Sequence, residues 1–203
     1  MNMWGLLAML LSLALGVAQA PAPVRVIVQT DLGEFEIEVD VAHAPVSAQN
    51  FLKYVEAGLY DGGRFYRTVR PDNQTAKPVK IDVIQGAANE ARQADFLPAI
   101  SLERTSVTGL RHIGGAVSMA RSTPDSATDE FFVCVGEQAA LDFGGARNPD
   151  GQGFAVFGRV VRGMEVVRAI QMAPAAGERL TPVVKILSAR RRASWPDTTD
   201  DQW

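Results

Sequence analysis

The stretch GGAVSMARSTPDSATDEFFVCVG, residues 114–136, carries the pattern that indicates the fold most clearly. Its ends, 114–120 and 130–136, are short apolar runs bounded by Gly and by a central cluster of Ser, Thr, Pro and Asp. Short apolar runs between turn-forming residues are typical of β-strands. This stretch therefore predicts two strands.

Strand-like segments continue on both sides of this stretch. Residues 24–39 alternate apolar and polar side chains around Asp31-Leu32-Gly33, which predicts a β-hairpin. Residues 70–80 are polar and are expected to form an exposed loop. Further strands are expected from composition at 64–69, 81–86, 154–161 and 183–187.

Two segments, 46–57 and 163–171, instead repeat apolar residues at helical spacing and predict two helices. Many short strands with few helices favour a mainly β fold, because such a chain buries its apolar faces best in a sandwich or barrel. We expect a closed or nearly closed antiparallel barrel.

Length and composition indicate one globular domain. The chain has 203 residues, 47% of them hydrophobic and 21% charged, which is typical of a chain that folds around one core. A formal net charge of −3 gives no general attraction to nucleic acid or anionic lipid, so we expect no nucleic-acid partner. The single cysteine, Cys134, excludes an intramolecular disulfide.

The N-terminal residues 1–20 are apolar, carry no charge and end in Ala18-Gln19-Ala20, the small-x-small pattern of a cleaved secretory signal. The mature chain would begin near Pro21 and be periplasmic or secreted, without stable membrane insertion. The absence of Lys and Arg at the start is unusual for a signal, so an uncleaved membrane anchor is the alternative.

The C-terminal residues 190–203 change from basic to acidic without apolar periodicity, which predicts a flexible tail. The alternative is a docking peptide that uses Trp195 or Trp203. The folded domain is therefore expected over residues 21–189.

The usual catalytic constellations are not evident. Ser118, His112 and Asp142 have the residue types of an acyl-transfer triad, but their spacing and the lack of a Gly-x-Ser-x-Gly motif do not support one. Cys134 lies in an apolar run and is expected to be buried. Only two histidines occur, His43 and His112, and neither belongs to a cluster with metal-ligand spacing. We expect no metal and no cofactor.

The chain nevertheless resembles the cyclophilins over residues 24–187. The resemblance is carried, in order, by APVSAQNF at 44–51, FYR at 65–67, IQG at 84–86, VSMA at 117–120, EFFVCV at 130–135, Leu141-Asp142 and FAVFGRVVRGMEVV at 154–167. It implies a mainly β fold, a closed eight-stranded antiparallel cyclophilin-like β-barrel capped by two helices.

The resemblance also implies an activity, peptidyl-prolyl cis/trans isomerisation. Rotation about an X-Pro bond is slow because amide resonance imposes a barrier of about 18–20 kcal/mol. No bond is broken, so a catalyst needs only a pocket for the proline ring and a donor that stabilises the rotated amide. Arg67 stands where cyclophilins have their essential arginine, two residues after Phe65.

The remaining substrate-binding positions follow from the same resemblance. Gln85 matches the glutamine that holds the substrate backbone and orients the arginine, and Phe132 matches the floor of the proline pocket, with Phe131 in the core. Arg121, Glu130 and Phe154 replace a common asparagine, glutamine and histidine. The substrate-binding set is Phe65, Val83, Gln85, Ala120, Arg121, Glu130, Phe132, Leu141 and Phe154.

Other positions depart from the family. Asp82 replaces a pocket phenylalanine, and Ala140 replaces an aromatic that contacts cyclosporin, which argues against tight cyclosporin binding. Residues 70–80 add about ten residues between Arg67 and Gln85, and residues 142–153 lengthen the loop after Leu141, which is expected next to the cleft. Glu130 is expected to lie near enough to Arg67 to pair with it and compete with substrate.

These observations together predict a monomeric isomerase that acts on proline-containing polypeptides and assists the folding of exported proteins. One alternative is a catalytically weak or inactive cyclophilin-fold binding or chaperone module. Another is an unrelated β-barrel, in which no groove would join Arg67, Gln85 and Phe132.

Overall fold

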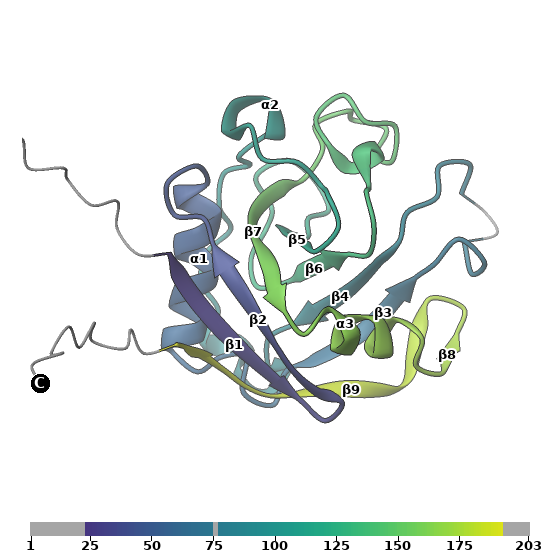
Figure 1. The fold of residues 1–203 in the computed structure, drawn as a ribbon. Coiled ribbons are helices and arrows are strands. Elements are labelled where there is room, and N and C mark those ends of the chain that lie inside the picture. Colours follow the sequence, from purple (N-terminus) through teal and green to yellow (C-terminus); the bar gives the residue numbers. More distant parts are fainter. Residues whose placement is uncertain (1–22, 75–76, 193–203) are drawn as a thin grey trace, which may run out of the picture.

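The computed structural model describes residues 23–74 and 77–192, which fold into strands and a few helices (Figure 1). The strands are β1 (Val24–Thr30), β2 (Gly33–Val39), β3 (Arg64–Val69), β4 (Val83–Ala87), β5 (Ala116–Met119), β6 (Phe131–Cys134), β7 (Ala155–Arg162), β8 (Ala175–Ala176) and β9 (Arg179–Arg191). The helices are α1 (Pro45–Glu56), α2 (Thr105–Thr108) and α3 (Met164–Gln171), with 3-10 turns at Glu90–Asp95 and Ala139–Leu141.

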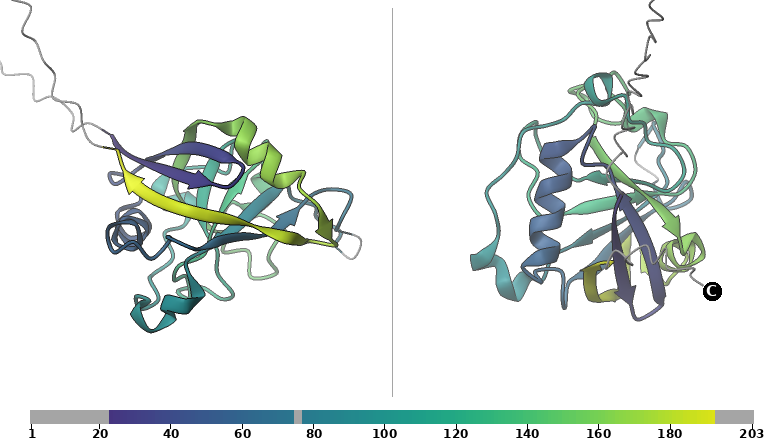
Figure 2. Two further views of the ribbon diagram at one scale, coloured as in Figure 1. Left: turned by 90° about the horizontal axis from the view of Figure 1, so that it is seen from below. Right: turned by 60° about the vertical axis from the view of Figure 1, so that its left-hand side comes forward.

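Eight of the strands close into a barrel. Antiparallel pairing runs in the order β1-β2-β7-β5-β6-β4-β3-β9, and β9 pairs in turn with β1, so each of these eight described strands has a neighbour on both sides. The two-residue β8 pairs with β9 outside this ring. The left view of Figure 2 shows β9 in yellow beside β1 in purple, where the ring closes. The expected closed eight-stranded antiparallel barrel is confirmed.

Two helices cover the barrel, within a residue of their expected bounds. Helix α1 has Pro at its first position, where a missing N–H leaves no bond unmade, and buries Phe51, Leu52 and Val55. It contacts β7 and β9 and lies along one side of the strands in the right view of Figure 2. Helix α3 contacts β2, β3 and β4.

Strand alternation divides the apolar residues into two groups, because successive side chains of a strand point to opposite faces. Phe131 lies in the main core inside the barrel, edge-to-face with the Phe51 ring, which confirms its expected place. The next residue, Phe132, belongs instead to a smaller apolar cluster outside, with Val83 and Leu141. This outer cluster is the base of the candidate active site.

The last strand is longer than expected and corrects the position of the C-terminal boundary. Arg190 and Arg191, expected to open a flexible tail, belong to β9 and pair with β1. Their side chains have carboxylate partners, since Arg190 Nη1 lies 2.6 Å from Asp61 Oδ1 and Arg191 Nη1 lies 2.7 Å from Glu56 Oε1. A basic run can therefore continue a strand when it pairs with a neighbouring strand and its side chains have carboxylate partners.

The expected signal at 1–20 and the two tryptophans, Trp195 and Trp203, lie outside the described residues. Within residues 23–74 and 77–192, no helix combines the length and apolar character needed to cross a bilayer.

Candidate active site

One cavity, of about 230 Å³, brings together most of the residues that the sequence assigned to the site. It opens on the outer face of the barrel, beside β4 and β6, and the loops at 70–80 and 142–153 contribute to its wall. The assigned residues that line it are Arg67, Val83, Gln85, Ala120, Arg121, Phe132, Leu141 and Phe154.

A β-bulge in β3 aims Arg67 at this cavity. Phe65 pairs with Gly86 and Arg67 pairs with Gln85, so Tyr66 is an extra residue opposite β4. Phe65 and Arg67 therefore face opposite sides of the sheet, although they are two residues apart. Phe65 is fully buried in the core, and its expected role in binding substrate is wrong.

Gly86 fits this arrangement because the Phe65 ring lies over its backbone. A Cβ at Gly86 would lie 2.9 Å from Phe65 Cε1, closer than carbon atoms pack. The two adjacent residues of β4 thus act on opposite faces of the sheet. Gln85 points into the cavity, and Gly86 leaves space for the Phe65 ring in the core.

Arg67 is held by two side chains. Its Nη1 donates to Gln85 Oε1 at 2.8 Å, and its Nε and Nη2 donate to Glu178 Oε2 at 2.9 and 2.6 Å. A guanidinium has five N–H groups, and these contacts with described residues use three of them. The other two, one on Nη1 and one on Nη2, remain available to a substrate carbonyl.

Glu130 has a different partner from the one expected. Its Oε2 accepts from Gln85 Nε2 at 2.7 Å and from the Tyr66 hydroxyl at 2.8 Å, whereas Glu178 takes the position beside Arg67. Burial, together with the nearby Glu130 charge, raises the pKa of Tyr66, which keeps its phenol a donor. Glu130 thereby fixes the Gln85 amide with its oxygen toward Arg67, and the expected competition of Glu130 for Arg67 is wrong.

The floor of the cavity is a stack of rings around Phe132. Phe154 meets the Phe132 ring edge-on at a centroid distance of 5.4 Å, and His112 stacks on it at 5.8 Å with planes 10° apart. Phe132 is only 5% exposed, and a ligand can reach only the small part of its ring that lines the cavity. A planar apolar floor of this kind suits the ring of a proline.

By the family resemblance, Asp82 takes the place of a pocket phenylalanine, and its neighbours line the cavity instead. Asp82 accepts a hydrogen bond from Gln171 Nε2, and burial raises its pKa. Ile81 and Val83, two residues apart, both line the cavity. Ile81 was missed as a site residue, although strand alternation placed it with Val83.

The three residues that resembled an acyl-transfer triad do meet. His112 Nδ1 lies 2.8 Å from Asp142 Oδ1, and His112 Nε2 lies 3.1 Å from Ser118 Oγ. Ser118 is fully buried opposite Phe132 in the β5–β6 pair, so no substrate carbonyl reaches its hydroxyl. The chain of hydrogen bonds supports the Phe132 ring instead. In the described ranges, no group of three or more His, Cys, Asp and Glu side chains is arranged to hold a metal ion.

Comparison with known families agrees with this geometry. The sequence profile described as "Cyclophilin type peptidyl-prolyl cis-trans isomerase/CLD" matches residues 25–191, which is nearly the whole described chain. The chain belongs to this family. Its barrel is thus that of a cyclophilin.

Named relatives include bacterial proteins. Peptidyl-prolyl cis-trans isomerase A of Dickeya dadantii is 38% identical over 152 residues, covering 74% of this chain and 73% of the relative. A peptidyl-prolyl cis-trans isomerase of Acinetobacter baylyi is 37% identical over 158 residues, covering 77% of each. A cyclophilin-type isomerase of Cryptosporidium parvum shares the fold, with a TM-score of 0.68 at 16% identity, covering 85% of this chain and 99% of that one.

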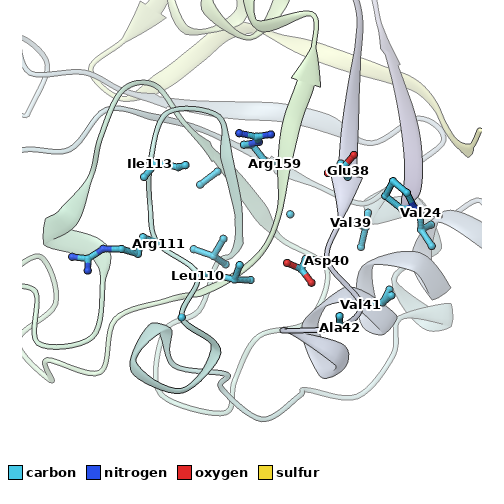
Figure 3. A pocket seen from close by; sticks show the side chains of 15 residues that line it. Val24, Glu38, Val39, Asp40, Val41, Ala42, Leu110, Arg111, Ile113 and Arg159 are labelled. Carbon is cyan, nitrogen blue, oxygen red and sulfur yellow. The ribbon is translucent and has the colours of Figure 1, made fainter. Parts of the chain in front are cut away.

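A larger hollow, of about 680 Å³, lies elsewhere on this cyclophilin. Figure 3 shows Leu110 and Ile113 on one side of it and Val24 and Val39 on the other. Its described lining is mostly apolar and contains neither Arg67 nor Phe132 nor any other assigned site residue. Volume alone therefore does not mark the active site.

The first prediction concerns Glu178 as a positioning residue for Arg67. Glu178→Ala is expected to lower kcat about tenfold with a smaller change in KM, because Arg67 loses two of its three fixed contacts. Glu178→Gln keeps an acceptor oxygen and is expected to recover most of this loss. Steady-state kinetics on an X-Pro peptide measure both variants. If Glu178→Gln and Glu178→Ala have equal kcat, Glu178 does not position Arg67.

A second prediction concerns acid stability. Burial lowers the pKa of His112 below its usual 6.5, although the hydrogen bond and the charge of Asp142 act to raise it. Asp142 also forms an ion pair with Arg111, at 3.4 Å. The unfolded chain therefore binds more protons as the pH falls below 6.5, so the stability contributed by neutral His112 is complete above that pH and declines below it. Urea unfolding between pH 7.5 and 5 should show this decline, and His112→Gln should reduce it. An identical decline in His112→Gln would assign it to other groups.

Proposed function

We propose that this cyclophilin catalyses cis/trans rotation about X-Pro peptide bonds. The observation that carries the proposal is the position of Arg67, which has two N–H groups that no described residue accepts from, beside a cavity floored by Phe132. The names of the Dickeya and Acinetobacter relatives support the same activity. A Cryptosporidium parvum cyclophilin structure, obtained in the presence of the dipeptide Ala-Pro and similar in fold, supports a proline-containing ligand.

The mechanism follows from what each group can do. The proline ring packs on Phe132 between Leu141 and Val83, while the acyl part of the X-Pro bond is free to turn. As the bond twists, the nitrogen becomes pyramidal and its lone pair can accept a hydrogen bond. The guanidinium of Arg67 donates to this nitrogen or to the carbonyl, and Gln85 and Glu178 hold it in place before substrate arrives.

A protease-coupled isomerisation assay on a short X-Pro peptide tests the activity. The purified chain should accelerate the slow isomerisation well above its spontaneous rate, which has a time constant of tens of seconds or longer. Folded protein that gives no acceleration would leave the alternative, a binding or chaperone module on the same fold. Titration of a proline peptide by NMR would then show whether the cavity still binds.

The substrates are proposed to be exported proteins, and the mature chain a periplasmic or secreted monomer. The support is the apolar, uncharged segment 1–20 that ends in Ala18-Gln19-Ala20. Expression of the whole chain in a bacterial host, followed by fractionation and mass measurement, tests this. A soluble exported product beginning at Pro21 supports it, whereas a full-length product in the membrane fraction indicates an anchor.

A further inference from the structure

The wall of the active-site cavity is strongly basic. Among the described residues, four cationic side chains line it and no Asp or Glu does: Arg67, Lys77, Arg121 and Arg147. Two of these charges have carboxylate partners outside the cavity, because Arg67 pairs with Glu178 and Arg121 pairs with Asp150 at 2.7 Å. Lys77 and Arg147 have no carboxylate partner among the described residues, so the unneutralised positive charge that a ligand meets comes from these two side chains.

Arg147 differs from the other arginines in having neutral partners. Its Nη1 donates to Gln74 Oε1 at 2.7 Å and to the carbonyl of Val79 at 2.6 Å. Within residues 23–74 and 77–192, no carboxylate lies within ion-pair distance of its guanidinium. Partial burial and the like charge of Arg67 lower the pKa of Arg147, opposed by Glu178. An anion entering the cavity would relieve this unfavourable environment.

The position of Arg147 is fixed before a ligand binds. Its backbone N–H donates to the carbonyl of Ala140 at 3.1 Å, and its side chain connects the loop at 142–153 with the loop at 70–80. Buried Gln74 in turn holds Ile81 on the cavity wall through bonds of its amide to the Ile81 backbone. The two longer loops thus join around the cavity, and a preorganised cation costs little entropy to engage.

We propose that this cavity selects X-Pro segments that carry an acidic residue next to the proline, with Arg147 as the specificity-determining residue. The apolar floor takes the proline ring, and the small volume of the cavity, about 230 Å³, brings the neighbouring residue against the basic wall. A planar guanidinium matches a carboxylate with two parallel hydrogen bonds. This specificity presupposes the isomerase activity proposed above.

The test measures isomerisation by exchange NMR, which needs no coupling protease, on peptides that differ only at the residues beside the proline. Glu, Gln and Lys are placed in turn before and after the proline. The purified protein should favour Glu over Lys at one of these positions by about tenfold in kcat/KM, equivalent to about 1.4 kcal/mol. In Arg147→Gln this ratio should fall to about two- or threefold, as one of several cationic side chains is removed.

A matched control and a salt series separate charge from folding. Arg92→Gln removes the same charge from an exposed ion pair with Asp95, outside the cavity, and should keep the wild-type ratio. Raising the ionic strength should reduce the Glu-to-Lys ratio of the unmodified protein, a result that does not depend on any variant folding.

The outcomes distinguish this inference from the proposed function. Turnover of the Gln peptides with equal kcat/KM for Glu and Lys would overturn the acidic preference and leave the isomerase intact. A Glu preference that Arg147→Gln does not change would overturn the role of Arg147. A folded protein that turns over none of the peptides would overturn both proposals.

Discussion

Arg67→Ala is expected to lower kcat/KM by about 100- to 1,000-fold, the loss measured when one preorganised donor is removed from a transition-state site. Gln85 and Glu178 hold the Arg67 guanidinium, and two of its N–H groups have no partner among the described residues beside the proline floor. The effect should lie mainly in kcat, because the donor contacts the rotated amide more strongly than the planar one.

The fold should tolerate this change. The Arg67 side chain is 35% exposed and its ion pair with Glu178 is partly solvated, so the free energy of unfolding should change by about 1 kcal/mol or less. Arg64→Ala is a matched control, since Arg64 lies on the same strand, pairs with Glu90 and is outside the cavity. It should keep near-normal kcat/KM. Equal activity in Arg67→Ala and wild type would exclude Arg67 as the catalytic donor.

Local sequence patterns predicted a closed or nearly closed antiparallel barrel, whereas the positions of most cavity residues came from the resemblance to the cyclophilins. Successive side chains of a strand point to opposite faces. Phe131 and Phe132 illustrate this, because Phe131 lies in the main core and Phe132 lies in the outer cluster. The failure at Phe65 has a definite cause. The extra residue Tyr66 turns the side chains that follow it in β3 to the opposite face of the sheet. Such a bulge can be recognised only from the pairing of β3 with the neighbouring strands β4 and β9, which the sequence of β3 does not contain.

Partners far apart in the chain were beyond the reach of sequence patterns. Glu178 is 111 residues from Arg67 and is brought to it by the short β8–β9 hairpin. Asp142 and His112 are 30 residues apart, and no local spacing predicts their contact. Arg147 and Gln74 belong to the two loops that were expected to be longer than in the family. Their contact depends on the path of each loop, which no local pattern predicts. Electrostatic detail of this kind decides the specificity of a site that the family resemblance locates.

Phe132→Ala is expected to have the second-largest effect, and on two quantities. Burial of the proline ring against Phe132 contributes at most about 1.5–3 kcal/mol to binding. Loss of this contact should lower kcat/KM by roughly 10- to 100-fold, mainly by raising KM. The free energy of unfolding should also fall, by about 3–5 kcal/mol, because the ring packs between His112 and Phe154 and its removal leaves a cavity.

Adjacent phenylalanines on opposite faces of β6 allow these two effects to be separated. Phe131→Leu and Phe132→Leu remove the same atoms from neighbouring positions, but Phe131 is in the core and Phe132 is in the cavity. Both should lower the free energy of unfolding by about 1 kcal/mol. Only Phe132→Leu should raise KM for an X-Pro peptide, measured well below the unfolding temperature of each variant. An equal rise in KM for both would mean that loss of core packing, rather than contact with the proline ring, reduces activity.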